Sequence, residues 1–322
     1  MPTQGSCAFS REGARTLIAF EQVAKTYRSA FGRRVEAVAD VSFTVAPGEV
    51  VGIAGPNGAG KSTLIALMLG LLAPTRGRVT LDGLSPREFA GHNGVGYLPE
   101  LITLEPSWRA DEALTRLGVL AGVPAASLRE TVDQVIGRVG LAEHRRKRCK
   151  QLSKGNLQKV GLAQSLLAER LVYVFDEPTH GLDPVWTHQF REIVAGLRRP
   201  DRAMLVASHN LDELERISDR VVIIDHGRIQ RIVDLRARVA SAEQSAYRMR
   251  VASGAPAVIA AFPGATEMEP GNVVIPAVDL ATLNRGLARA IADGAIVSAV
   301  QPVQSALERE FHAAVGAPGG GA

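Results

Sequence analysis

The sequence predicts an α/β fold, with a mainly parallel sheet covered by helices on both faces, followed by a second, small α+β domain. Between residues 16 and 234, short apolar runs typical of buried strands alternate with segments whose apolar residues recur at helical spacing. From about residue 235 the alanine content rises and turn signals interrupt the chain, which indicates a new domain. A chain of 322 residues with 46% hydrophobic content can bury two such cores.

The first domain contains most of the predicted strands. We predict strands at residues 17–23, 41–45, 49–54, 77–81, 94–98, 171–175, 203–207 and 220–225, and a helix at residues 62–72. Between residues 107 and 140, apolar residues recur every three to four positions. This periodicity predicts a helical subdomain at about residues 100–155.

The second domain is predicted to span residues 235–315. Its patterns indicate strand 247–252, helix 256–262, strands 266–269 and 272–277, helix 279–293 and strand 296–302. This order is the split βαβ of ferredoxin-like domains. A last helix is predicted at residues 305–315. Residues 1–15 are expected to form a flexible leader and residues 316–322, which are rich in glycine, a disordered tail.

Charge and cysteine content restrict the partners only weakly. The formal net charge is +4, which permits an anionic partner but does not require one. The basic run at residues 145–148 is expected to be a solvated helix end rather than a contact with lipid or nucleic acid. Cys7 and Cys149 are expected to be exposed, incidental thiols, and their scarcity fits a reducing compartment. No run approaches the ~18 consecutive apolar residues of a membrane span, and the N-terminus lacks a signal sequence, so we expect a cytoplasmic chain.

A glycine-rich loop lies between a predicted buried strand and a predicted helix, and it matches G-x-x-x-x-G-K-[ST]. Its residues are Gly55, Pro56, Asn57, Gly58, Ala59, Gly60, Lys61, Ser62 and Thr63. Backbone N–H groups in such a loop converge on phosphate oxygens, and the helix that follows points its positive dipole end at them. We expect Lys61 to reach the β- and γ-phosphates of a nucleotide and the Ser62 hydroxyl to bind Mg²⁺.

Two carboxylates follow a later apolar strand, at Asp176 and Glu177. In parallel sheets, ligands bind at the carboxyl ends of the strands, so these acids are expected beside the glycine-rich loop. Asp176 is predicted to hold Mg²⁺, and Glu177 to orient and deprotonate the attacking water. Together with the loop, they predict a site that binds a nucleotide and Mg²⁺ and hydrolyses the nucleotide.

Residues 152–158, Leu-Ser-Lys-Gly-Asn-Leu-Gln, resemble the LSGGQ signature of ABC ATPases. Asp183 lies in a segment that resembles their D-loop, His209 resembles their switch histidine, and Tyr27 resembles the aromatic residue that stacks on adenine. These motifs, in the family's order, imply a P-loop NTPase of ABC type over residues 16–234. The resemblance makes Glu177 and His209 the catalytic residues.

In that family, two nucleotide domains dimerise head to tail with ATP between them. The resemblance therefore implies that Ser153, Gly155 and Asn156 contact ATP held by a second subunit, and Asp183 belongs to the same cofactor-binding set. Glu100 stands in the Q-loop, where the family has glutamine. A carboxylate can bind Mg²⁺ but cannot donate a hydrogen bond when ionised, so Glu100 joins Ser62 and Asp176 as a predicted metal ligand.

The chain's ending, residues 303–311, resembles the Leu-Glu-x-x-Phe ending of exporter ATPases. We therefore expect the ATPase of an exporter at the cytoplasmic face of the cell membrane, as a homodimer on membrane subunits, without nucleic acid. An importer ATPase shares the same core and stays open as an alternative. A soluble ABC ATPase of translation or repair is disfavoured by the single ATPase domain and the absence of heptads. Glu177 and His209 argue against a regulatory module without turnover.

Overall fold

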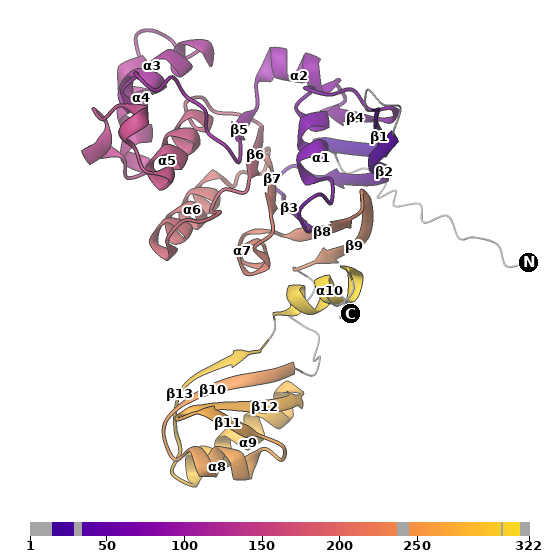
Figure 1. Cartoon of the computed structure of the whole chain (residues 1–322), viewed down its shortest axis with the longest axis vertical. Coiled ribbons are helices and arrows are strands. Elements are labelled where there is room, and N and C mark those ends of the chain that lie inside the picture. Colours follow the sequence, from indigo (N-terminus) through magenta and orange to yellow (C-terminus); the bar gives the residue numbers. More distant parts are fainter. Residues whose placement is uncertain (1–14, 29–33, 237–244, 304, 316–322) are drawn as a thin grey trace, which may run out of the picture. The chain divides into compact units, whose positions relative to one another are not determined.

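The computed structural model describes residues 15–28, 34–236, 245–303 and 305–315. The chain divides into two compact units, Met1–Val233 and Asp234–Ala322. Figure 1 shows the elements of both units along the chain. Each unit has its own hydrophobic core.

The first unit is built around a six-stranded sheet of order β5-β6-β7-β3-β8-β9. Its strands are β3 (Val50–Ala54), β5 (Gly96–Leu98), β6 (Val172–Asp176), β7 (Ala203–Ser208), β8 (Arg220–Asp225) and β9 (Arg228–Asp234). The neighbouring strands from β5 to β8 pair in parallel. Every residue of β3, β6 and β7 is buried, as strands covered on both faces require. The predicted α/β class with a mainly parallel sheet is confirmed.

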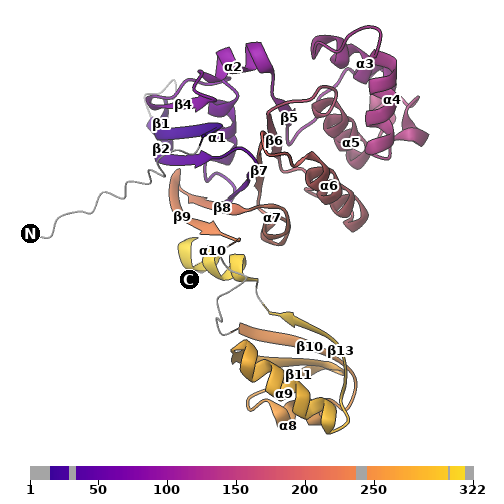
Figure 2. The same ribbon diagram turned by 180° about the vertical axis from the view of Figure 1, so that it is seen from behind.

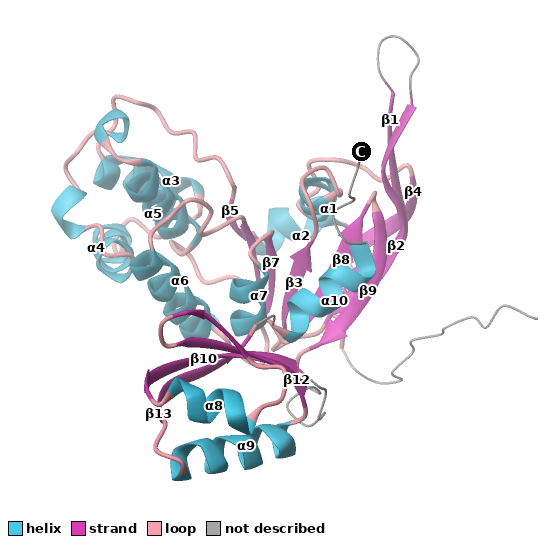
Figure 3. Cartoon of the chain, turned by 60° about the horizontal axis from the view of Figure 1, so that its bottom comes forward, coloured by secondary structure: helices cyan, strands magenta, loops and turns pink. Residues whose placement is uncertain are grey.

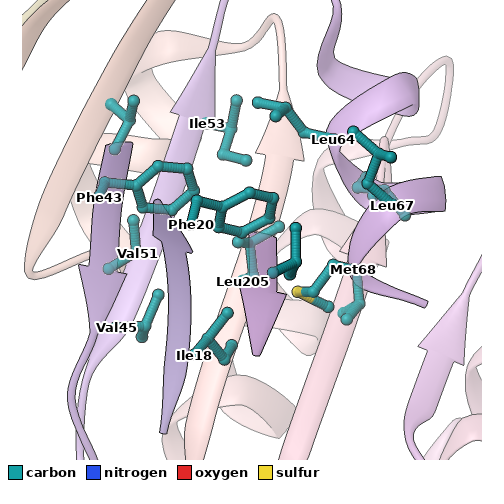
Figure 4. Close-up of a cluster of buried hydrophobic side chains, with 14 of the residues drawn as sticks. Ile18, Phe20, Phe43, Val45, Val51, Ile53, Leu64, Leu67, Met68 and Leu205 are labelled. Carbon is teal, nitrogen blue, oxygen red and sulfur yellow. The ribbon is translucent and has the colours of Figure 1, made fainter. Parts of the chain in front are cut away.

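A second, antiparallel sheet of order β2-β1-β4 packs against the first. It consists of β1 (Ile18–Arg28), β2 (Arg34–Val45) and β4 (Arg76–Leu81). The sequence predicted shorter strands here and did not separate them from the parallel sheet. Phe20 of β1 and Phe43 of β2 stack with their ring centroids 4.6 Å apart. Figure 4 shows them among Ile53 of β3, Leu205 of β7 and Leu64 of helix α1 (Lys61–Met68).

Two groups of helices complete the first unit. Helices α2 (Pro86–Asn93), α6 (Pro184–Leu197) and α7 (Leu211–Ile217) connect or flank the strands. Helices α3 (Ala110–Leu120), α4 (Leu128–Arg138) and α5 (Lys154–Ser165), with the short η1 (Ala142–His144) and η2 (Cys149–Gln151), form the helical subdomain. In both Figure 1 and Figure 2 this subdomain lies beyond β5, on the side away from the antiparallel sheet.

Two elements and one burial state differ from the sequence-based expectation. Helix α2 was missed, although Ser85 and Glu88 form a capping box at its start. Strand β9, which follows the turn at Gly227, was also missed. Cys149 is buried rather than exposed, because its N–H donates to the Trp108 carbonyl and fixes the segment to the base of α3. Burial raises the pKa of its thiol. Cys7 lies outside the described residues.

The second unit has a four-stranded antiparallel sheet of order β11-β12-β10-β13, with α8 and α9 on one face (Figure 3). Its elements are β10 (Ser245–Ser253), α8 (Ala255–Ala261), β11 (Thr266–Glu269), β12 (Asn272–Val278), α9 (Leu280–Ala292), β13 (Ile296–Pro302) and α10 (Ala306–Val315). This is the βαββαβ order that the sequence predicted, and Met249, Phe262 and Ile275 lie in its core.

Most residues at the two ends of the chain lie outside the described ranges. Of the leader predicted at residues 1–15, only Arg15 is described, and its guanidinium pairs with Asp82 at 2.7 Å. The tail predicted at residues 316–322 lies outside the described residues. Across the described ranges, no helix has the length and apolarity that a bilayer crossing requires.

Candidate functional site

The glycine-rich loop runs from the end of β3 to the first turn of α1. Gly60 is the N-cap of α1 and has a φ of 109°, a conformation that favours glycine. A Cβ on Gly60 would also lie 2.6 Å from the carbonyl oxygen of Ala37 in β2. The sequence therefore needs glycine here for both backbone conformation and space. The result is a helix N-terminus preceded by a glycine-rich loop, an arrangement that binds phosphate groups.

Lys61 is buried at the start of α1, with 7% of its surface exposed. Its ammonium donates to the Gly55 carbonyl at 2.7 Å and to the Pro56 carbonyl at 3.3 Å. The same nitrogen is 3.7 Å from Oε1 of Glu177. A desolvated cation is thus held by the loop's own carbonyls and faces the carboxylates at the end of β6. Ser62, the next residue, is exposed.

Glu177 and His209 meet at the ends of two adjacent parallel strands. Asp176 pairs with Ala207 in the sheet register, and the Glu177 N–H donates to the Ala207 carbonyl at 2.8 Å. Glu177 has a φ of 46°, unusual for a residue with a side chain. Its Oε2 is 2.7 Å from Nδ1 of His209. The structure therefore brings together the two residues that the sequence predicted to be catalytic.

Asp176 is a buried carboxylate in an acidic neighbourhood. Its pKa is raised to about 6, first by burial and then by the negative charges of Glu100 and Glu177, while the Lys61 charge opposes the rise. Its Oδ1 has no hydrogen-bond partner among the described residues. A buried carboxylate oxygen without a partner, close to other acids, suits a divalent cation with oxygen ligands. Glu100 is an exposed residue in the loop after β5, and its negative charge is close enough to raise the pKa of Asp176.

The residues that resemble the ABC signature lie elsewhere, at the start of α5. Ser153 caps this helix and accepts a hydrogen bond from the Asn156 N–H at 3.3 Å. Asp183 similarly caps α6, accepting from the Trp186 N–H at 2.8 Å. A Cβ on Gly155 would lie 3.4 Å from the side chain of Leu182, so the start of α5 lies close to the segment that leads into α6. Within the described part of the chain, no hydrogen bond joins Ser153, Gly155 or Asn156 to the glycine-rich loop.

Tyr27 lies on β1 with 40% of its surface exposed. The Lys25 ammonium lies 5.7 Å from the centroid of its ring. Tyr27 is opposite Val35 in the β1–β2 register, and β2 continues to Ala37, whose carbonyl faces Gly60. The strand pair that carries the ring therefore borders the glycine-rich loop. This placement leaves a face of the ring open to solvent.

Sequence reasoning missed three residues beside Glu177. The Thr179 hydroxyl donates to Glu213 of α7, which is 1% exposed. Burial raises the pKa of Glu213 to about 7. The His180 ring lies 4.9 Å from the ring of His209, measured between centroids. In the sequence, Thr179 and His180 only follow an acid and Glu213 only belongs to a helix, so no local signal distinguished them.

Comparison with known proteins finds similar chains among ATP-binding proteins of ABC transporters. A family model described as ABC transporter matches residues 38–180. The chain is 36% identical over 199 residues to the ABC transporter ATP-binding protein NatA of Bacillus subtilis, covering 61% of this chain and 80% of that protein. It is 37% identical to the methionine import ATP-binding protein MetN of Caulobacter vibrioides, covering 66% and 65% of the two chains. It is 35% identical to the Nod factor export ATP-binding protein I of Bradyrhizobium diazoefficiens, covering 62% and 66%.

Solved structures agree on the fold. One, an ATP-binding subunit of an ABC transporter, is 29% identical and superposes with a TM-score of 0.61, covering 69% of this chain and 91% of that one. The chain spans only 60% and 62% of the length of two further relatives, both uncharacterized ABC transporter ATP-binding proteins, from Synechocystis and Nostoc.

Proposed function

Because the chain belongs to the ABC transporter family of ATP-binding proteins, we propose that it binds and hydrolyses ATP to drive a membrane transporter. The observation that carries the proposal is the meeting of Lys61, Glu177 and His209 beside the glycine-rich loop. These three groups supply a phosphate-binding cation, a general base and a neighbouring imidazole. Their assembly within one chain supports catalysis rather than nucleotide binding alone.

Lys61 and the loop bind the triphosphate. The ammonium exchanges its hydrogen bonds to the Gly55 and Pro56 carbonyls for the β- and γ-phosphates, which are stronger, charged acceptors. Backbone N–H groups of residues 55–63 and the N-terminus of α1 hold the remaining phosphate oxygens. Tyr27 stacks on the adenine with the exposed face of its ring.

Ser62 and Asp176 would hold Mg²⁺, and Glu100, whose charge acts on Asp176, would be a third ligand. The buried Oδ1 of Asp176 without a partner supports this assignment. When bound, the cation neutralises charge on the phosphates. Asp176 must be ionised to bind it, and its pKa of about 6 leaves the carboxylate largely ionised at neutral pH.

Glu177 and His209 act on the attacking water. Glu177 orients the water through a hydrogen bond and accepts its proton. Because the carboxylate is buried, its interactions with the water and the proton are stronger than they would be in solvent. His209 holds Glu177 in place through the 2.7 Å contact and responds to the γ-phosphate. Loss of the γ-phosphate would then change the position of His209, at the end of β7.

A second copy of the chain completes the pocket. Ser153, which is exposed, and the half-buried Gly155 and Asn156 offer a hydroxyl, a close backbone N–H and a helix N-terminus at the start of α5. We propose that they contact the γ-phosphate held by the partner copy, with Asp183 at the same interface. Binding of ATP closes this homodimer, and release of products reopens it.

A mixing experiment tests the shared pocket. Lys61→Ala disables the phosphate loop, and Gly155→Asp places a negative charge where the partner's phosphate would approach. Each variant alone should lose most of its turnover at limiting ATP, whereas a mixture forms heterodimers in which one pocket combines an intact loop with an intact signature. Restored ATP hydrolysis in the mixture is the expected result. A mixture as inactive as its components, despite heterodimers seen by native mass spectrometry, would exclude the shared pocket.

The transporter is proposed to be an exporter, with this subunit on the cytoplasmic face of the membrane and bound to membrane subunits. The support is the exporter-like ending at residues 303–311, part of which lies in α10. The 37% identity to a protein named for methionine import favours the alternative of an importer. Purification of the chain with its membrane partners, followed by transport assays in inverted vesicles, distinguishes the two. Accumulation of cargo inside these vesicles indicates export, and loss of cargo from them indicates import.

A further inference from the structure

His180 is not used by the proposed hydrolytic mechanism, yet its imidazole lies in the catalytic cluster. Glu177, His180 and His209 each offer one ligand atom, and these three atoms all lie within 4.8 Å of one another. The arrangement follows from the backbone. Residues 177–180 form a tight turn in which the His180 N–H donates to the Glu177 carbonyl at 3.3 Å. His209 approaches from the end of the neighbouring strand β7.

The geometry points to a second metal site, in which Glu177, His180 and His209 bind a zinc ion. Two imidazoles and one carboxylate are a common ligand set for Zn²⁺ and leave one coordination position open. Such ligands lie about 2 Å from the ion, so their atoms are separated by roughly 3.3 Å in a tetrahedral site. Glu177 and His209 are already closer than this, at 2.7 Å, so the ion would enter between them.

The side chains have the freedom to close around an ion. The His209 side chain is 48% exposed, and His180 is also exposed, so both rings can rotate without disturbing the core. Glu177 is buried and fixed. Its two oxygens face different groups, since Oε1 is nearest to Lys61 and Oε2 is nearest to His209. The oxygen that faces His209 can therefore bind an ion while Lys61 stays near the other oxygen.

This site differs in chemistry from the proposed magnesium site. Mg²⁺ prefers oxygen ligands, which Ser62 and Asp176 provide, whereas imidazole nitrogen favours zinc and its neighbours among the transition metals. Zinc bound to Glu177 would occupy the oxygen that must accept a proton from water. It would also take His209 away from the nucleotide. The consequence is inhibition of hydrolysis by zinc.

His180 provides the test, because it is the ligand without a role in the proposed hydrolysis. Full-length protein is titrated with Zn²⁺ by calorimetry in the absence of nucleotide, and Co²⁺ serves as an optical probe of coordination. The wild type should bind one ion per chain. His180→Asn should weaken binding at least tenfold, since loss of even an outer-shell partner costs about 10–100-fold. His188→Asn, which removes an exposed histidine on α6, should leave the affinity unchanged.

Equal affinities for the wild type and His180→Asn would overturn the proposal, and so would the same loss in His188→Asn. Thermal unfolding of each variant shows that the fold is intact. A second measurement follows ATP hydrolysis in saturating Mg²⁺ with added zinc. The zinc concentration for half-inhibition, taken relative to each variant's own zinc-free rate, should rise at least tenfold in His180→Asn. A wild type that binds zinc but never hydrolyses ATP would refute the proposed function and leave the zinc site standing.

Discussion

The glycine-rich loop and the signature segment both carry phosphate-binding groups, but they differ in how their groups are paired. At the loop, Lys61 is buried, bonded to two carbonyls and 3.7 Å from Glu177. At the start of α5, the Ser153 hydroxyl has only the N–H of Asn156 as its described partner, Ser153 is exposed and Gly155 is half-buried. The cation of the first region thus has its partners within the same chain. The second has the groups of a binding site, and no hydrogen bond among the described residues joins them to a residue outside the starts of α5 and α6, which is why we assign it to a partner's nucleotide.

The greatest loss of turnover is expected from the residue that activates the attacking water. Glu177→Gln keeps an acceptor for His209 but removes the general base, so turnover should fall by about 10²–10⁴-fold. ATP binding should persist, because the loop and Lys61 are untouched. The closed dimer should then accumulate. Phosphate release, equilibrium ATP binding and light scattering with Mg-ATP measure these three outcomes. Wild-type hydrolysis in this variant would refute the role of Glu177.

A substitution on the signature side should separate binding from turnover in a different way. Gly155→Asp adds a negative charge to the first turn of α5, where an acid stabilises the helix itself. The variant should fold and bind ATP as the wild type does, yet lose turnover by roughly a hundredfold, because the charge repels the partner's γ-phosphate. Gly155→Ala is the matched control and should lose far less. Equal losses in the two variants would mean that shape, not charge, matters at this position.

Lys61→Ala should weaken ATP binding by about 10–100-fold, since charge-assisted hydrogen bonds contribute about 1.5–3 kcal/mol. The variant also removes the bonds to the Gly55 and Pro56 carbonyls. Lys61→Arg, which keeps a cation, distinguishes loss of charge from a change in loop structure. Fluorescent nucleotide titration measures the affinities. ATP affinity unchanged in Lys61→Ala would remove Lys61 from the binding site.

The sequence predicted the regular parts of this fold because local patterns determine them. Buried runs such as residues 171–175 and 203–207 indicate strands on their own, and the glycine-rich loop fixes its position between strand and helix. The βαββαβ order of the second unit followed from alternation and turn residues. Helix α2 also has a local signal, the capping box formed by Ser85 and Glu88, but few apolar residues at helical spacing follow it.

What the sequence could not show depends on contacts between distant segments. Cys149 stands in a run of basic residues, and only its pairing with the chain near Trp108 buries it. His180 reaches His209, and Thr179 reaches Glu213, because β6 and β7 are neighbours in the sheet. Nothing in the spacing of these residues gives that adjacency.

Burial of the Glu213 carboxyl should make the stability of the fold depend on pH. In the folded chain the pKa of Glu213 is about 7, above its ordinary value of 4.5. A raised pKa means that the folded state binds the proton more tightly, so the stabilisation is complete below about pH 4.5 and is lost as pH rises through about 7. Glu213→Gln mimics the neutral carboxyl and keeps an acceptor for Thr179.

The Glu213→Gln variant should therefore lose this fall in stability between about pH 5 and pH 7. At pH 8 it should exceed the wild type by roughly 1–2 kcal/mol, allowing for relaxation around the buried charge. Urea denaturation across this pH range measures the difference, and Glu192→Gln, which neutralises an exposed carboxylate on α6, serves as the control. Parallel pH profiles for Glu213→Gln and the wild type would show that Glu213 is already ionised without cost. The carboxylates beside Glu177 would then be better solvated than their burial implies, and the base would work in a wetter site than the one described here.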